Sequence, residues 1–328
     1  MKAIGYYTYG PPEVLRYEEI EKPAAGDDEV LIKIRAASVN PLDWHFMRGE
    51  PYLVRLMTGL RKPKVTRLGV DVAGVVEAVG RNVTRFHLGD HVFGSCLGAF
   101  AEYAATPESK VVAKPANVTF DQAAAVPVAS FTALQGLRDK GHIQPGRKVL
   151  INGAAGGVGT FAVQIAKSFG AEVTGVCSTR NVEMVRSIGA DHVIDYTKED
   201  FSKSGQRYDI LFDGISNHPF SECRRILHPN GIYIPFGGPA GRWMIGPLAS
   251  SAKDRASSLF GGPKFAGVLA KANLDDLTIM QGLLEAGKVT PVIDRRYTLS
   301  ETPAAIRYLE EGHARGKVII TLEDRGRG

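Results

Sequence analysis

Hydrophobic and polar positions along the chain change character near residue 120. Residues 1–120 contain short apolar runs separated by Gly, Pro and Asp, a pattern typical of the strands of a barrel-like domain. These runs are KAIGYY, VLIKIRAASV, VAGVVEAVG, HVFGSC and FAEYAAT. From about residue 122, the apolar runs VLIN, VTGVCS, HVID, DILFDG and IYIPFGG alternate with helical patterns. Alternation of strands and helices predicts a parallel, doubly wound sheet.

The segments that flank this alternating region have patterns of their own. DQAAAVPVASFTALQGLRDKG predicts a helix that is opened by Asp121 and broken near Pro127. After Gly238, a stretch rich in Gly, Ser and Lys runs to about residue 272 with weak periodicity, which favours a lid or interface loop with some helix. The C-terminal part predicts two amphipathic helices and a final strand.

Residues 147–159, RKVLINGAAGGVG, form a glycine-rich turn between an apolar strand and the helical stretch TFAVQIAKSFG. A second strand, AEVTGVCS, follows about twenty residues on, and this is the context that a dinucleotide-binding turn requires. Glycines leave backbone N–H groups and the positive end of a helix free to face a pyrophosphate. The alternative is a tight turn with no ligand. The turn's candidate cofactor residues are Gly153, Ala155, Gly156, Gly157 and Val158, and Gly159 completes the motif.

The tip of the second strand indicates which dinucleotide is bound. An Asp or Glu there would bind the ribose 2′-hydroxyl and repel a 2′-phosphate. The tip instead reads Cys177, Ser178, Thr179, Arg180, Asn181, whose hydroxyls and guanidinium suit a phosphate dianion. NADPH is therefore favoured over NADH. The alternative is a helix N-cap at Ser178 or Thr179 followed by a solvated arginine.

Composition fits an enzyme of two domains and excludes several other classes. The chain has 328 residues, 44% of them hydrophobic and 23% charged, with a net charge of +5. Dispersed Lys and Arg give no support for a nucleic-acid partner. No segment approaches ~18 uninterrupted apolar residues and no signal peptide is evident, so we expect a cytoplasmic protein with no membrane partner. Three widely spaced cysteines form neither a disulfide framework nor a metal knuckle.

Several strings, in order along the chain, resemble those of the medium-chain dehydrogenases/reductases, specifically the zinc-free quinone oxidoreductase or zeta-crystallin type. They are AASVNPLDWHFMRG, LGVDVAGVVEAVG, FHLGDHVFG, AAAVPVASFTAL, NGAAGGVG and GHARGKVII. VTGVCS, GADHVIDY and HARGKV are most similar to the branch containing the reticulon-4-interacting oxidoreductase. The resemblance implies an α/β protein: a GroES-like catalytic domain over 1–121 and 273–328, a Rossmann domain over 122–272, and a homodimer.

Differences from the zinc-dependent members of this family are equally informative. In those enzymes the loop equivalent to SVNPLD carries a cysteine ligand, and the stretch equivalent to LGVDVAG carries a His-Glu pair. Here Asn40 and Val70 stand in the Cys and His places, which leaves only Asp71. One carboxylate does not hold a catalytic zinc, and the four-cysteine structural loop is also missing. The sequence therefore predicts no metal.

Without a metal, hydride transfer is easier to a quinone or a conjugated carbonyl, because the negative charge spreads to oxygen and side-chain donors stabilise it. Asn40 is the candidate amide donor, and its alternative is an Asn-Pro turn residue. Asp43 is a candidate for orienting Asn40 or for starting a helix. Tyr52 is near the place where related reductases carry a tyrosine proton donor. Trp44 and Phe46 are candidate pocket walls or core residues.

The resemblance implies further cofactor contacts outside the glycine turn. Thr132 corresponds to a position near the nicotinamide ribose, and Tyr196 to a tyrosine near the adenosine 2′-phosphate. A lysine of the family after the second strand is missing, which leaves Arg180 as its substitute. The remaining implied contacts are the backbone after two strands and a C-terminal segment that closes over NADPH: Gly214, Ile215, Phe236, Gly237, Gly238, His313, Ala314 and Arg315.

These observations predict an NADPH-dependent oxidoreductase acting on quinones or α,β-unsaturated carbonyls. Two alternatives stay open: a metal-free alcohol or aldehyde reductase, and an NADPH-binding partner protein without activity, as crystallin-type relatives allow.

Overall fold

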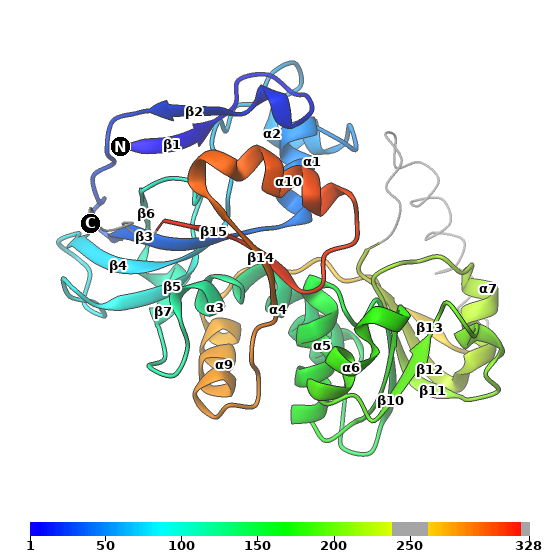
Figure 1. The fold of residues 1–328 in the computed structure, drawn as a ribbon. Coiled ribbons are helices and arrows are strands. Elements are labelled where there is room, and N and C mark those ends of the chain that lie inside the picture. The colour runs from blue at the N-terminus through cyan, green and yellow to red at the C-terminus, as the bar shows by residue number, and fades with distance from the viewer. Residues whose placement is uncertain (238–261, 323–328) are drawn as a thin grey trace. The chain divides into compact units, whose positions relative to one another are not determined.

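The computed structural model describes residues 1–237 and 262–322 (Figure 1). The chain divides into two compact units. The first comprises Met1–Val128, Ala272–Gly287 and Pro291–Gly328, and the second comprises Ala129–Lys271 and Lys288–Thr290. The first unit therefore combines both ends of the chain, and the second is inserted between them, which is the predicted arrangement. We describe each unit by itself.

A seven-stranded sheet forms the centre of the first unit, in the order β14-β15-β3-β4-β5-β7 with β6 paired to β3 (Figure 1). All pairs are antiparallel except β14 with β15. A separate antiparallel pair joins β1 and β2. The strands are β1 Lys2–Gly5, β2 Arg16–Glu19, β3 Glu29–Val39, β4 Asp71–Val79, β5 His91–Ser95, β6 Tyr103–Pro107, β7 Val111–Ala113, β14 Ile293–Thr298 and β15 Lys317–Thr321.

Each apolar run of the N-terminal region contributes to a strand of this unit, as predicted. The long strand β3 is central because it pairs with three neighbours, and Ile32, Ile34 and Val39 from it enter the hydrophobic core. The sequence did not predict β2, β7 or β14. β2 and β14 have few buried residues, so they lack the apolar alternation by which a strand is detected.

Five α-helices lie within the described part of the first unit: α1 Pro41–Arg48, α2 Val54–Thr58, α3 Phe120–Ala124, α9 Leu274–Glu285 and α10 Thr302–Glu310. The helix predicted from Asp121 in fact begins one residue earlier, because Thr119 is its N-cap and forms a capping box with Gln122. The Asp121 carboxylate instead accepts a hydrogen bond from Arg296. The two C-terminal helices predicted by periodicity, α9 and α10, are confirmed.

The second unit is built on a six-stranded sheet in the order β10-β9-β8-β11-β12-β13, and every pair is parallel (Figure 1). This confirms the doubly wound sheet. The strands are β8 Lys148–Asn152, β9 Glu172–Cys177, β10 His192–Asp195, β11 Tyr208–Asp213, β12 Leu227–Pro235 and β13 Lys264–Phe265. Helices α5 Gly157–Ser168, α6 Val182–Ser187 and α7 Phe220–Cys223 connect them.

The boundary between the units lies after Val128, seven residues later than the predicted boundary after Asp121. α3 packs against β3 and β4 and so belongs to the first unit. The predicted break near Pro127 is confirmed, because α4, Pro127–Gln135, begins at that proline and a π-helical stretch, Gly136–Lys140, follows. The second boundary, after Lys271, is one residue from the prediction. Most of the predicted lid or interface loop lies outside the described residues.

Candidate functional site

The glycine-rich turn of the second unit joins β8 to α5, and two of its glycines are required by geometry. Gly153 has φ +86°, in the left-handed region that favours glycine. A Cβ on Gly159 would lie 2.1 Å from the carbonyl oxygen of Gly153, closer than real atoms approach. The first turn of α5 therefore lies directly on the end of β8. In dinucleotide-binding folds, the third glycine of the motif permits this close packing of the helix on the turn.

The N–H groups expected to face a pyrophosphate are not all available. The N–H of Gly156 donates to the carbonyl of Gly153 over 3.0 Å, so it closes the turn instead of binding an anion. Gly157 and Val158 occupy the first turn of the twelve-residue helix α5, where N–H groups have no acceptor within the helix. The anion-binding capacity of this helix end therefore belongs to Gly157 and Val158.

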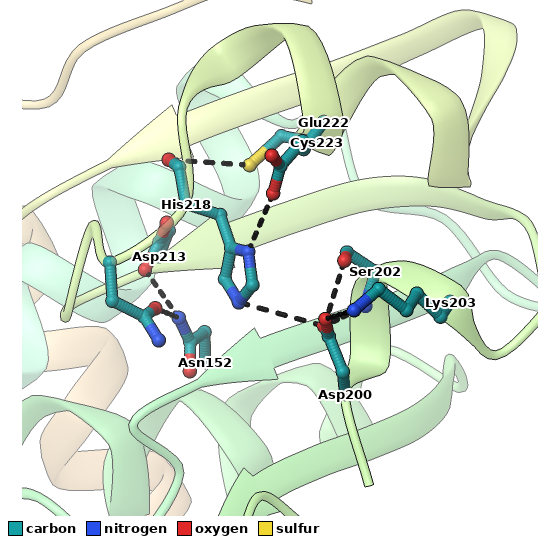
Figure 2. Close-up of polar contacts among 9 residues, drawn as sticks. Asn152, Asp200, Ser202, Lys203, Asp213, His218, Glu222 and Cys223 are labelled. Atoms are coloured by element: carbon teal, nitrogen blue, oxygen red, sulfur yellow. Dashed lines mark hydrogen bonds and ion pairs between the residues drawn. The ribbon is translucent and has the colours of Figure 1, made fainter.

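Asp213, at the end of β11, organises the neighbouring loop. This fully buried carboxylate accepts hydrogen bonds from the side chain of Asn152 (2.9 Å) and from the backbone N–H groups of Ile215 (3.0 Å) and Ser216 (2.8 Å). Its other oxygen accepts the hydroxyl of Tyr233 over 3.0 Å. Figure 2 shows Asn152 reaching Asp213 from the adjacent strand. One carboxylate thus fixes the ends of β8, β11 and β12 relative to one another.

Five predicted cofactor residues come together around this carboxylate. The side chain of Ile215 lies over Gly153, 3.0 Å from where a Cβ on that glycine would be. The ring of Phe236 covers Gly214, and a Cβ on Gly237 would lie 2.4 Å from the Gly214 carbonyl oxygen. Phe236 also stacks on Phe212 with ring centroids 4.1 Å apart. The structure therefore gathers these residues at the carboxyl edge of the sheet, where doubly wound folds bind ligands. Gly238 lies outside the described residues.

The tip of β9 lies beside an acidic side chain that the sequence did not indicate. Thr179 donates its hydroxyl to Asp195, at the end of the adjacent strand β10, over 2.6 Å. Hydrogen bonds from Thr179 and Thr197 hold the pKa of Asp195 well below its usual range. Ser178 accepts from the Asn181 side chain, while Arg180 and Tyr196 are exposed. A carboxylate therefore lies beside the hydroxyl expected to contact a 2′-phosphate, and the Lys198 ammonium pairs with that carboxylate over 3.3 Å.

The first unit contains a buried polar cluster formed by Ser38, Asn40, Asp43, Asp71 and Lys317, none of them more than 3% exposed. One Asp71 oxygen accepts the Ser38 hydroxyl over 2.7 Å and the Asn40 amide over 2.8 Å. The Lys317 ammonium lies 2.5 Å from the Asn40 carbonyl oxygen and 3.7 Å from that same Asp71 oxygen. The cluster forms because β15 and β4 flank β3 in the sheet. Its residues come from these three strands and from the segment that follows β3.

This geometry corrects the role predicted for Asn40. Its amide nitrogen donates to Asp71 and, over 3.3 Å, to the Ser38 carbonyl, so both of its N–H groups are already used. The residue is 1% exposed. Asn40 therefore links Lys317 to Asp71 and positions the start of α1, and it has no donor left for a substrate oxygen.

Asp43 combines the two roles that the sequence left open. One carboxylate oxygen accepts the backbone N–H of Asn40 over 2.7 Å, which fixes the first turn of α1. The other accepts the N–H of Gly69 over 3.0 Å. Burial raises the pKa of Asp43 to about 7, although both N–H donors oppose the shift. Asp43 therefore acts on the loop through backbone contacts and, at 2% exposure, is a positioning residue.

Lys317 was not among the residues selected from the sequence. Burial lowers the pKa of its ammonium, and the nearby carboxylate of Asp71 opposes that shift. The signal that identifies it is a lysine beginning an apolar strand, KVIIT, in which the first four residues are all buried. A lysine is almost never fully buried unless it is paired, so its position in this strand indicates a buried acid nearby.

The other polar and aromatic candidates between residues 44 and 52, and His45 beside them, are less buried. Tyr52 is half-buried, and the Arg55 guanidinium lies 4.7 Å from its ring centroid. Trp44 and Phe46 both pack against the core of the first unit, which agrees with the core alternative for these aromatics. The Nδ1–H of His45 donates to the Glu50 carbonyl over 2.6 Å, and burial lowers the pKa of His45. The proton-donor role of Tyr52 stays a prediction.

The remaining cofactor candidates lie on separate units. Thr132 is half-buried on α4, in the second unit. Residues 313–315 belong to the first unit, where the N–H of Arg315 donates to Asp294 over 2.8 Å and the Tyr308 hydroxyl donates to the same oxygen over 2.6 Å. Asp294 therefore fixes the backbone of this segment. The cofactor contacts of Thr132, His313, Ala314 and Arg315 stay predictions.

Beyond the carboxyl edge of the second unit, a histidine lies between two acids (Figure 2). His218 contacts Glu222 over 2.9 Å and Asp200 over 3.7 Å, and its ring meets Phe201 edge-on. Asp200 also accepts from Ser202, which holds the pKa of Asp200 at about 2. Over 1–237 and 262–322, no group of three or more His, Cys, Asp or Glu side chains is arranged to hold a metal ion.

Comparison with known proteins places these two units in a family. The model of the alcohol dehydrogenase GroES-like domain matches residues 26–116, and that of the zinc-binding dehydrogenase matches residues 188–320. The chain is 35% identical to 2-methylene-furan-3-one reductase from Solanum lycopersicum over 98% of its own length and 79% of the relative. The chain belongs to the medium-chain dehydrogenase/reductase family, in its quinone oxidoreductase group.

Two further members of the family support this placement. The chloroplastic NADPH-dependent alkenal/one oxidoreductase of Arabidopsis thaliana is 34% identical to this chain. The match covers 98% of this chain and 79% of the length of that relative. The quinone oxidoreductase of Coxiella burnetii superposes with a TM-score of 0.83 at 29% identity, covering 98% of this chain and 99% of that one. Both match the chain across both units, so the family assignment covers the whole fold.

Proposed function

We propose that this protein is a zinc-independent, NADPH-dependent oxidoreductase that transfers hydride to quinones or α,β-unsaturated carbonyls. Relatives named as an alkenal/one oxidoreductase, a furanone reductase and a quinone oxidoreductase support the substrate class. The NADPH-dependent relative supports the cofactor. The glycine-lined turn, the free N–H groups at the start of α5 and Arg180 fit a phosphorylated dinucleotide.

One observation carries the zinc-independent part of the proposal. The Lys317 ammonium lies between Asn40 and Asp71, which occupy two of the positions where zinc-dependent members carry ligands. The Lys317 ammonium in this place pairs with the Asp71 carboxylate, and its positive charge repels a divalent cation. Asp71 is thereby prevented from acting as a metal ligand, and a lone carboxylate would not suffice for a catalytic zinc in any case.

The absence of a Lewis acid determines which acceptors can react. NADPH supplies the hydride when it is bound. A quinone or an enone accepts hydride at carbon and disperses the negative charge to its oxygen, whereas a saturated ketone needs that charge stabilised locally. The buried polar cluster fixes the start of α1, and Tyr52, the proposed proton donor, follows that helix. The turn at Gly153–Gly159 and the loop at Asp213 provide the rigid backbone on which the cofactor is held.

Steady-state NADPH oxidation over a panel of acceptors tests this function. We expect turnover of quinones, enones and enals, little turnover of saturated ketones, and no loss of activity with a chelator. Stoichiometric zinc in the purified protein, or inactivation by the chelator, would refute the zinc-independent part. Turnover of saturated ketones would indicate an alcohol or aldehyde reductase, and tight NADPH binding without turnover of any acceptor would indicate a non-enzymatic partner protein.

A second experiment addresses the proton donor. Tyr52→Phe should reduce turnover of enones while sparing quinones, since a reduced quinone takes its proton from water. Equal loss on both acceptors would mean that Tyr52 binds substrate or supports the loop. We also expect a homodimer and a cytoplasmic location; light scattering of the purified protein tests the first and fractionation of cells tests the second.

A further inference from the structure

A short segment after α1 exposes large apolar side chains to solvent. Leu53 is 50% exposed, Leu56 and Leu60 are each 68% exposed, and Val65 is 39% exposed. We call these four side chains the leucine surface. They occur within residues 53–65, around the helix α2. Single exposed leucines need no explanation, but a group of them on one segment marks an interaction site.

The opposite side of this segment is firmly attached to the first unit. The Tyr9 hydroxyl contacts the Thr58 hydroxyl over 2.8 Å and donates to the Gly59 carbonyl over 2.6 Å. Arg55 stacks on the Tyr9 ring at 4.6 Å and donates to the Gly49 carbonyl over 3.0 Å. Thr58 is 3% exposed. The leucine surface is therefore the outer side of a packed element whose inner side already has its partners.

The charges beside the leucine surface all have one sign. Arg61, Lys62 and Lys64 are exposed, and none of them forms an ion pair with a described residue. No Asp or Glu occurs between residues 51 and 70. By contrast, Arg55 and Arg67 are engaged with aromatic rings or with Glu18. Three cations that have no ion-pair partner among residues 1–237 and 262–322 thus neighbour the exposed leucines in sequence, with no acid in the segment to neutralise them.

We propose that residues 53–65 dock the protein on an anionic lipid surface, with the leucine surface entering the headgroup boundary and Arg61, Lys62 and Lys64 contacting the lipid charges. Apolar side chains combined with cations are the features of peripheral membrane segments, and each cation near an anionic leaflet adds to the attraction. No described helix is long and apolar enough to cross a membrane, so the contact is peripheral. This amends the expectation of no membrane partner.

A second copy of the chain fits this surface less well. In a two-fold dimer the same patch faces itself, so the three cations of one copy would face those of the other and repel. An anionic lipid surface instead matches both the apolar and the charged part. The docking is separate from the proposed redox activity, and it is measurable on a protein that turns over no substrate.

Flotation with lipid vesicles tests the proposal on the full chain. We expect binding to vesicles of phosphatidylcholine with 30% phosphatidylglycerol, little binding to pure phosphatidylcholine, and weakening of the binding by salt. Leu53→Ser/Leu56→Ser/Leu60→Ser and Arg61→Glu/Lys62→Glu/Lys64→Glu should each reduce the bound fraction at least about tenfold. Matched controls are Leu88→Ser/Leu97→Ser and Lys140→Glu/Lys264→Glu/Lys288→Glu, which alter exposed residues elsewhere and should bind like the parent protein.

Each alternative result counts against the proposal. Absence of binding to anionic vesicles overturns it, and so does equal loss in the control variants, which would mean that overall charge or solubility governs binding. A concentration-dependent dimer that the triple serine variant abolishes, without vesicle binding by the parent, would assign the leucine surface to a second copy. Thermal unfolding of each variant confirms that it is folded. If both triple variants are folded and still bind anionic vesicles like the parent protein, the proposal is also overturned.

Discussion

The buried polar cluster of the first unit and the glycine-rich turn of the second differ in what their structure requires of the side chains. In the cluster, charged side chains are removed from water, and each is satisfied by another side chain or a backbone group. In the turn, side chains are missing, so that backbone and helix lie close together. A closed cluster depends on the identity of every member, whereas an open turn depends on the absence of atoms. The two regions should therefore respond differently to substitution.

Removing the buried cation is the strongest test of this difference. Lys317→Met should destabilise the protein by about 3–5 kcal/mol, because breaking a buried pair leaves an uncompensated charge on Asp71. Lys140→Met, at an exposed position, should change stability little. Urea unfolding followed by circular dichroism measures both. Adding Asp71→Asn to Lys317→Met should recover part of the loss, and a double variant no more stable than the single one would contradict the charge-based explanation.

The pH dependence of the same cluster gives the next largest effect. The pKa of Asp43 is raised to about 7 in the folded protein, against about 4 for an unfolded aspartate. Between these values the folded state binds more protons than the unfolded state. The stabilising contribution of Asp43 is therefore fully present below about pH 4 and is lost as pH rises to about 7, by at most about 1.4 kcal/mol per pH unit.

The difference in unfolding free energy between the parent protein and Asp43→Asn isolates the pH-dependent contribution of Asp43. It should vary over that pH window and level off above it. A difference that stays constant from pH 4 to 7 would mean that Asp43 is ionised throughout, and that its two backbone donors outweigh its burial.

Glycine substitutions probe the turn. Gly159→Ala should cost about 2 kcal/mol or more in stability, since its Cβ would require the turn or α5 to shift, and it should weaken NADPH binding at least about tenfold. Gly156→Ala is the matched control for stability, because its Cβ would lie 3.4 Å from the Gly153 carbonyl, an ordinary contact. Thermal unfolding of both variants and fluorescence titration of Gly159→Ala measure these effects. Equal stability of the two variants would refute the close-packing role of Gly159.

The smallest expected effect concerns the choice of dinucleotide at the tip of β9. We expect NADPH to bind at least ~10-fold more tightly than NADH, about 1.4 kcal/mol. Arg180→Ala should remove most of this preference and leave NADH binding nearly unaffected. Equal affinities of the parent protein for both dinucleotides would refute the predicted preference for NADPH. Calorimetric titration with each dinucleotide distinguishes these outcomes.

Local patterns in the sequence were sufficient for the framework of both units. The apolar runs predicted β3, β4 and five of the six parallel strands of the second unit, all except β13. Pro127 indicated the break before α4. The glycine turn was placed correctly because a strand and a glycine cluster occupy the thirteen residues 147–159, and a helical stretch follows directly. Boundaries were less accurate, since the capping of α3 by Thr119 depends on a hydrogen bond with Gln122.

The sequence by itself determined the fold class and the dinucleotide turn, because each of these depends on residue type at neighbouring positions. Its resemblance to a known family implied that Asn40 and Val70 stand in the places of zinc ligands. Only the tertiary structure decided what Asn40 does. Lys317 reaches Asn40 across 277 positions of sequence, because β15 pairs with β3 at the centre of the sheet. In the same way, the parallel pairing of β10 with β9 brings Asp195 to Thr179. Strand pairing joins residues that no local pattern relates, and buried charges must find their partners through such contacts.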